Sequence, residues 1–380
     1  MKVHRLLVPG LCAAGVLMAC SSTQAPAEPG GGSSGGTASG SGGASSGGSS
    51  SSGGSSGSSG GTSGGGSSSS GGSSSSGGSS SSGSSGGGPT CTTPTQTETW
   101  ADGKHLTAPV DIGADSIVTI APGAGIVVSA GVTITVHGKL QADAKTNHVT
   151  ISNYGVPWNG IVVASGGSLA LTGVDMAGAG IQTLAGNCAS SYDYGTITLG
   201  QFAVQGTLKT DHAAFVSGGH SSVTGTLTAT FLDYSGIGLE IDAGGTLMIS
   251  DSKITGTGGD FFEANDATSA KLVHAEYSTI TGTHCPFHFT NLDQFQLDHV
   301  ATSGDTYGLM LYNDNRGPHS ISYCSFADPY WSQDTRNAVI SVDHSYIQST
   351  TLSVGQVTVT NPASAPLTGI GPRGTPGPKG

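Results

Sequence analysis

An eight-residue phrase that recurs along the chain constrains its fold more than any other feature. The phrase reads apolar, x, apolar, polar, x, small, x, apolar, and its copies follow one another every 19 to 26 residues, apart from one interval of 39 near Cys188. Because apolar and polar residues alternate within it, each copy predicts a short strand with one buried face. The nine copies begin at Val149, Leu169, Leu208, Leu227, Leu247, Val273, Phe295, His319 and Ile340.

A constant repeat of about 22 residues with two or three short strands predicts a solenoid. We expect an all-β fold, a right-handed parallel β-helix of about ten coils in which each coil pairs with the next at about 4.8 Å. An antiparallel β-sandwich also has many short strands, but it places hairpin turns every 8–12 residues and keeps no constant phase. The persistent phase favours the β-helix.

The chain before the repeats has the composition of an exported and tethered protein. Lys2 and Arg5 precede an apolar stretch that is too short to span a bilayer, so residues 1–19 predict a signal peptide. In residues 30–88, 55 of 59 positions are Gly or Ser, which predicts a disordered, flexible tether over 20–90. We expect the β-helix domain over 91–362. Residues 363–380 predict a flexible tail that ends in a short Gly-x-y run. The alternative is that this run is the start of a longer collagen-like segment.

Two resemblances accompany these segments. Leu17-Met18-Ala19-Cys20 resembles the lipobox of bacterial lipoproteins, which implies that Cys20 is acylated and anchors the protein to the outer membrane or cell surface. Residues 111–163 resemble the first coils of exported bacterial β-helix proteins of the pectate-lyase-like type, on the motifs Ala121-Pro122-Gly123, Gly138-Lys139-Leu140 and Trp158-Asn159-Gly160-Ile161. That resemblance implies the fold alone, because the fold carries lyases, hydrolases, adhesins and spacers alike.

Charge excludes one class of partner. The predicted domain holds 8 Lys and Arg against 23 Asp and Glu, a net charge of −15, and it has no basic patch. Nucleic acid is therefore not an expected partner. Its four cysteines allow two disulfides in three pairings, and their spacing does not suggest a zinc site. The four are Cys91, Cys188, Cys285 and Cys324.

In a parallel β-helix, equivalent positions of successive copies of the phrase stack in columns along the coils, so aligning the copies predicts which outward side chains are neighbours. The fourth position of the phrase should stack as Ser152, Thr172, Asp211, Thr230, Ser250, Glu276, Asp298, Ser322 and Asp343. Glu276 and Asp298 fall on successive coils about 5 Å apart, where two carboxylates hold a cation or share a proton. They are therefore the weak candidates for a calcium site or for catalysis, although no resident cofactor is expected.

The dipeptide Asp-His recurs at the same phase as Asp211-His212, Asp298-His299 and Asp343-His344. Because adjacent residues in a strand point to opposite faces, we expect the two side chains of each pair to lie apart.

A second group of polar residues follows the strand after the glycine. Glu240, His288, Tyr312, Asp314 and Arg316 are candidates for glycan contact there, with Trp158 and Tyr330-Trp331 as rings that stack on sugars. The catalytic signatures of β-helix polygalacturonases and pectate lyases are missing from the sequence. We therefore expect a lipid-anchored, non-catalytic binding or adhesion surface, with glycans as ligands. The alternatives are a polysaccharide lyase or glycoside hydrolase, and a spacer without a ligand.

Overall fold

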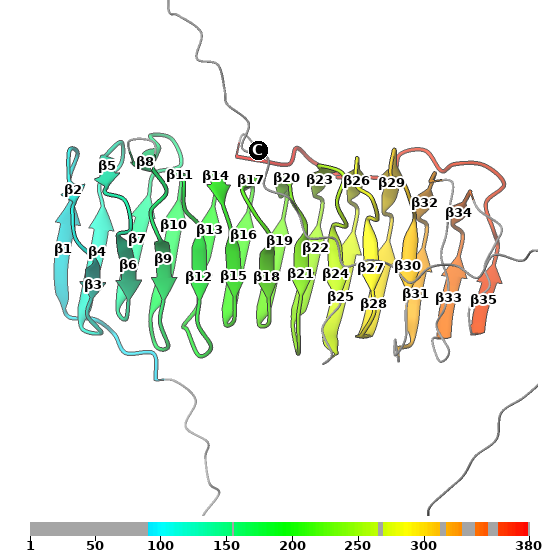
Figure 1. Cartoon of the computed structure of the whole chain (residues 1–380), viewed down its shortest axis with the longest axis horizontal. Coiled ribbons are helices and arrows are strands. Elements are labelled where there is room, and N and C mark those ends of the chain that lie inside the picture. The colour runs from blue at the N-terminus through cyan, green and yellow to red at the C-terminus, as the bar shows by residue number, and fades with distance from the viewer. Residues whose placement is uncertain are drawn as a thin grey trace, which may run out of the picture. The chain divides into compact units, whose positions relative to one another are not determined.

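The computed structural model describes residues 90–153, 156–264, 269–311, 317–328, 339–348 and 356–378, which all belong to the compact unit Ser80–Gly380. These residues form strands and turns, and the strands assemble into three parallel sheets. Figure 1 shows the strands of successive turns side by side, from β1 in cyan to β35 in red.

The first sheet, sheet A, has 13 strands. In spatial order it contains β1 (Gln96–Trp100), β4 (Ser116–Ile120), β7 (Lys139–Asp143), β10 (Ser168–Thr172), β13 (Ser191–Asp193), β16 (Thr207–Asp211), β19 (Thr226–Thr230), β22 (Thr246–Ser250), β25 (Ala270–Glu276), β28 (Leu292–Asp298), β31 (His319–Ser322), β33 (Val339–Asp343) and β35 (Gln356–Thr360).

Sheet B has 12 strands and sheet C has 10. Sheet B contains β2 (His105–Leu106), β5 (Gly125–Val128), β8 (Val149–Ser152), β11 (Val174–Ala177), β14 (Thr196–Gly200), β17 (Ala214–Ser217), β20 (Asp233–Gly236), β23 (Lys253–Gly256), β26 (Thr279–Thr281), β29 (Ala301–Ser303), β32 (Ser325–Phe326) and β34 (Tyr346–Ile347). Sheet C contains β3 (Val110–Ile112), β6 (Thr133–Val136), β9 (Gly160–Val163), β12 (Ile181–Thr183), β15 (Phe202–Val204), β18 (Ser221–Val223), β21 (Leu239–Ile241), β24 (Phe262–Ala264), β27 (Phe287–Phe289) and β30 (Leu309–Leu311).

The chain visits the three sheets in turn, and each strand pairs in parallel with the strand one coil later. This is a parallel β-helix of about eleven turns, which confirms the predicted fold class. The interior is filled by the alternate residues that the phrase makes apolar, such as Leu247 and Ile249 of β22, which are 0% and 2% exposed. Aromatic rings fill its second half, where Phe262 stacks on Phe287 one coil away.

Phase alignment located most of sheet A correctly. The outward column of Thr172, Asp211, Thr230, Ser250, Glu276, Asp298, Ser322 and Asp343 is present, and each member lies in register with its neighbour. Two details of the prediction were wrong. The copy at Val149 belongs to sheet B, where Val149 pairs with Val174, so Ser152 is not in this column. Asp193 of β13 completes the column within the interval of 39 residues.

The turn from sheet A to sheet B explains the recurring Asp-His pairs. From β10 onward, the residue after each sheet A strand has a positive φ, for example 49° at His212, 51° at His299 and 45° at His344. This left-handed conformation turns the ring back toward the preceding aspartate, and His212 Nδ1 donates to Asp211 Oδ1 over 2.9 Å. The expectation that each Asp and His lie apart was therefore wrong, because these histidines lie in the turn and not in the strand.

These turn residues form a ring column on the outside of the helix. His212 stacks between Tyr194 and Phe231, with centroid distances of 4.9 and 4.4 Å. Farther along the solenoid, rings at the same turn position stack with centroids 4.6 to 5.0 Å apart, and these rings are Tyr277, His299, Tyr323 and His344. Asp251 occupies the position between the two stacks and carries no ring.

The C-terminal segment fills that gap. Figure 1 shows the red segment after β35 running back along the solenoid over β29, β26 and β23. Arg373 binds Asp251 through its backbone N (2.9 Å), Nε (2.8 Å) and Nη2 (2.6 Å), and its guanidinium lies 3.8 Å from the ring centre of Tyr277. Gly377 N also donates to Phe231 O over 2.8 Å. Residues 363–378 of the expected flexible tail thus contact the helix, and the Gly-x-y run lies on the ring column.

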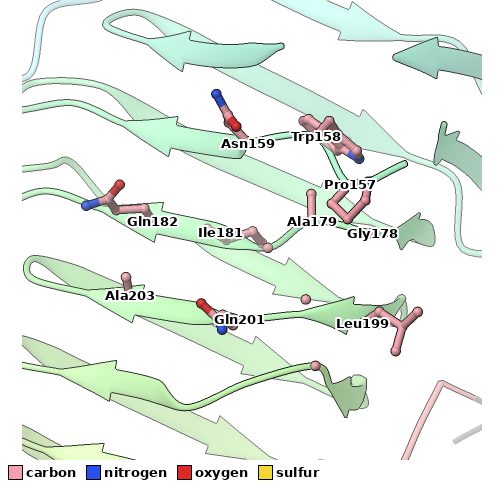
Figure 2. A pocket seen from close by; sticks show the side chains of 13 residues that line it. Pro157, Trp158, Asn159, Gly178, Ala179, Ile181, Gln182, Leu199, Gln201 and Ala203 are labelled. Carbon is pink, nitrogen blue, oxygen red and sulfur yellow. The ribbon is translucent and has the colours of Figure 1, made fainter. Parts of the chain in front are cut away.

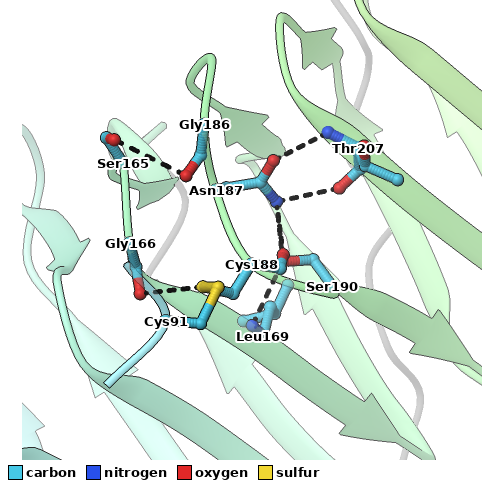
Figure 3. The surroundings of a disulfide bond; sticks show 9 residues. All are labelled: Cys91, Ser165, Gly166, Leu169, Gly186, Asn187, Cys188, Ser190 and Thr207. Atoms are coloured by element: carbon cyan, nitrogen blue, oxygen red, sulfur yellow. Dashed lines mark hydrogen bonds between the residues drawn. A yellow bond between two sulfur atoms is a disulfide. The ribbon is translucent and has the colours of Figure 1, made fainter. Parts of the chain in front are cut away.

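A disulfide crosslinks the N-terminal coils of the solenoid. Cys91 and Cys188 are bonded, which joins the segment before β1 to the turn before β13 (Figure 3). Asn187 orders that turn, because its Nδ2 donates to Cys188 O, Ser190 Oγ and Thr207 O, each over 2.9 Å. The second disulfide that the cysteine count allows is not formed, since Cys285 and Cys324 are both unpaired and buried.

Candidate functional site on sheet C

The outer face of sheet C carries an unbroken column of polar and small side chains. Its strands present their central residue outward between two buried neighbours, and the register aligns these residues one per coil. The column runs Gln182, Ala203, Ser222, Glu240, Glu263, His288 and Met310. From Gln182 to His288 there are five steps of about 4.8 Å, so this part spans about 24 Å.

A pocket lies at the N-terminal end of this column. Its volume is about 330 Å³, and its lining residues include Asn159, Gln182, Leu199 and Gln201. Figure 2 shows Asn159, Gln182 and Gln201 on successive coils, with Leu199 toward the sheet B side. The described lining residues provide amides and backbone groups, and none of them has an ionisable side chain. Such a pocket suits an uncharged polar ligand.

Leu199 is unusual in this pocket. It is 65% exposed, has a φ of 56°, and lies where the register between β14 and β17 shifts. A β-bulge turns a side chain away from the alternation of its strand, and a large apolar residue in the left-handed region is strained. The bulge therefore presents an apolar side chain to the pocket at a cost in backbone energy, as ligand-contacting residues often do.

An acid and histidine cluster lies at the other end of the column. Asp260 accepts from two rings, His284 Nδ1 to Oδ1 over 2.8 Å and His288 Nδ1 to Oδ2 over 2.6 Å. Although burial opposes ionisation, these hydrogen bonds lower the pKa of Asp260 to about 2. Glu263 lies in register between Glu240 and His288, and burial, together with the charge of Asp260, raises its pKa. The cluster therefore holds one firmly ionised and one more readily protonated carboxyl group.

The structure brings together two of the predicted glycan-contact residues, Glu240 and His288, through Glu263. Trp158 lines the pocket next to Asn159, but it is 4% exposed and donates Nε1 to Ala177 O, which leaves little of its ring for a sugar to stack on. The other predicted residues of this group lie outside the described residues, and these are Tyr312, Asp314, Arg316, Tyr330 and Trp331. The predicted acylation site, Cys20, also lies outside them.

The predicted pair Glu276 and Asp298 does lie on adjacent coils in register. Asp298 is already engaged, because Ser322 Oγ donates to its Oδ1 over 2.6 Å and His299 Nδ1 lies 3.1 Å from its Oδ2. Glu276 Oε2 lies 3.9 Å from His274 Nε2 beside a hollow of about 220 Å³. A cation bound by the pair would share the Asp298 oxygens with these two contacts.

Asp260 and Glu263 were missed at the sequence level. Glu263 was within reach, because Leu-Glu-Ile, Phe-Glu-Ala and Phe-His-Phe at 239–241, 262–264 and 287–289 share one alternation. Asp260 lies in a turn of variable length, where no phase applies.

Among the described residues no helix is long and apolar enough to cross a membrane. Comparison with known protein families, with curated proteins and with solved structures found no significant match.

Proposed function

We propose that this protein is an exported, lipid-anchored β-helix of the pectate-lyase-like type that binds a linear glycan along sheet C. The observation that carries the proposal is the column from Gln182 to His288, with the uncharged pocket at one end and the acid and histidine cluster at the other. Sugar hydroxyl groups both donate and accept hydrogen bonds, which the amides, carboxylates and imidazoles of this face supply. An exposed Leu199 provides apolar contact for a sugar ring.

A glycan array probed with the purified protein tests this proposal. Leu199→Ser and Gln182→Ala should each weaken binding to the selected glycan, whereas Val216→Ser should not. Val216 is the matched control because it is also an exposed apolar residue, 40% exposed, and does not line the pocket. Binding that is unchanged in both pocket variants would contradict the proposal, and absence of any glycan ligand would favour a spacer.

Anchoring has a separate test. Cys20→Ala should leave the protein unacylated, and it should then fractionate away from membranes, because acyl chains provide the membrane affinity. A variant that stays with the membrane fraction as the parent does would exclude lipid anchoring through Cys20.

The opposite pKa shifts of Asp260 and Glu263 favour a second candidate function, hydrolysis of an acidic polysaccharide. Glycosidases use one carboxyl group that stays protonated as the acid, and a basic group that activates water. Glu263 would donate its proton to the leaving glycosidic oxygen, and His288, oriented by Asp260, would accept a proton from the attacking water. Reducing-end release that is lost in Glu263→Gln but kept in Glu276→Gln would establish this activity. No release from any acidic polymer by the parent would leave binding as the function.

A further inference from the structure

Four metal-ligating side chains of different kinds converge where the acid and histidine cluster meets Cys285 and Met310. Donor atoms of Asp260, His284 and Cys285 all lie within 4.8 Å of one another. Cys285 Sγ lies 3.5 Å from His284 Nδ1 and 2.8 Å from Met310 Sδ. Three successive coils supply these groups: Asp260 precedes β24, His284 and Cys285 precede β27, and Met310 is the central residue of β30.

We propose that His284, Cys285, Met310 and Asp260 form a binding site for a single copper(I) ion. This inference does not depend on glycan binding. Thiolate, thioether and imidazole together are a soft ligand set, and such sets select copper(I) over the hard cations. Calcium and magnesium require several oxygen ligands, whereas this group offers one carboxylate.

The distances fit an ion after a small expansion. Metal bonds to nitrogen and sulfur are about 2.0 to 2.3 Å long, so the ligand atoms of a tetrahedral site lie about 3.3 to 3.8 Å apart. The Cys285 and His284 atoms, 3.5 Å apart, already fall in this range. The two sulfur atoms, at 2.8 Å, would have to separate by about 1 Å, which the flexible Met310 side chain permits.

Burial and second contacts also suit a metal. Cys285 is fully buried, but the His284 side chain is 44% exposed and provides a route of entry. Asp260 Oδ2 stays bonded to His288 when Oδ1 moves to the ion, so His288 orients the carboxylate from outside the site. Binding replaces the thiol proton of Cys285, which passes to solvent as the thiolate–copper bond forms. The proton on His284 Nδ1 moves to Nε2, so that Nδ1 is free to bind the ion.

Copper(I) titration under ascorbate, against a chromogenic copper(I) chelator, tests the proposal on the purified protein. We expect one equivalent per chain in the parent, loss of that binding in Cys285→Ser, and about 10-fold weaker binding in Met310→Leu. Cys324→Ser is the matched control, because Cys324 is the other buried free cysteine among the described residues. Its Sγ accepts from Val300 N and donates to Ser322 O, which are backbone atoms. It should bind copper as the parent does.

If Cys285→Ser does not fold, judged by circular dichroism, His284→Ala at its partly exposed position replaces it and should lose the site. Binding by Cys285→Ser or His284→Ala equal to the parent would overturn the proposal. A parent that takes up no copper(I), or that binds zinc(II) in its place with the same dependence on Cys285, would overturn it as well.

Discussion

Asp305 lies in a buried carboxyl pair whose protonation should control stability between pH 4 and pH 7. Its Oδ1 accepts from Thr283 N over 2.6 Å and from Thr283 Oγ1 over 2.7 Å, while its backbone N donates to Asp328 Oδ1 over 3.1 Å. Thr302 donates to the other oxygen of Asp328. Asp305 Oδ2 is buried without a hydrogen-bond partner.

Burial raises the pKa of Asp305 from 3.8 to about 7, and the nearby charge of Asp328 adds to the effect. Between these two values the folded state holds a proton that the unfolded state has released, so stability falls as pH rises from about 4 to 7. One pKa unit corresponds to about 1.4 kcal/mol, which sets an upper limit of about 4 kcal/mol on the loss. For a domain of this size that is a change in melting midpoint of about 10 °C at most.

Asp305→Asn removes the titration while keeping the contacts. The amide oxygen still accepts from Thr283, and the uncharged amide nitrogen takes the place of the protonated Oδ2. We expect the variant to be more stable than the parent at pH 8 and to show a flatter dependence of melting midpoint on pH between 4 and 8. Thermal unfolding followed by circular dichroism measures both.

The control is Asp293→Asn, which changes an exposed aspartate on β28 and should follow the parent profile. Parallel pH profiles for the parent and Asp305→Asn would refute the reasoning, and so would lower stability of Asp305→Asn at pH 8.

Three further predictions concern the solenoid as a whole. Leu247→Asp puts an unpaired charge into the core and should abolish folding, whereas Lys253→Asp on an exposed position should not; equal solubility of both would contradict the assigned alternation. Cys188→Ser opens a loop of 97 residues and should cost about 2–4 kcal/mol in urea unfolding, a loss that added reductant should reproduce in the parent and that an unchanged midpoint would disprove. Arg373→Ala removes the guanidinium that pairs with the buried Asp251, and it should lower the melting midpoint by several degrees and speed proteolysis of the C-terminal segment. A midpoint equal to the parent's would show that this ion pair contributes nothing.

The repeat allowed a large part of the fold to be predicted, because a parallel β-helix places equal phases in register. Once the phase of one strand per coil was known, the pairing of Glu276 with Asp298 followed, and so did the inward direction of Leu247. The copy at Val149 was misplaced because sheet B strands have the same alternation as sheet A strands. Alternation identifies a strand but not its sheet.

The residues of the turns could not be placed in this way. The turn from sheet B to sheet C varies in length, so counting from the repeated phrase does not place Asp260, His284 and Cys285. Likewise, the alternation of apolar and polar residues gives no sign of the left-handed conformation of His212, because this residue lies in the turn after the strand.

Sequence by itself determined the coil, its phase and the inner and outer faces, because these depend on local alternation repeated at a fixed interval. Tertiary structure alone decided which polar groups of the turns and of the C-terminal segment meet. Arg373 and Asp251 are 122 residues apart, and Cys285 and Met310 come from different coils. Contacts of this kind depend on the path of turns and of the returning C-terminal segment, which no periodic pattern records.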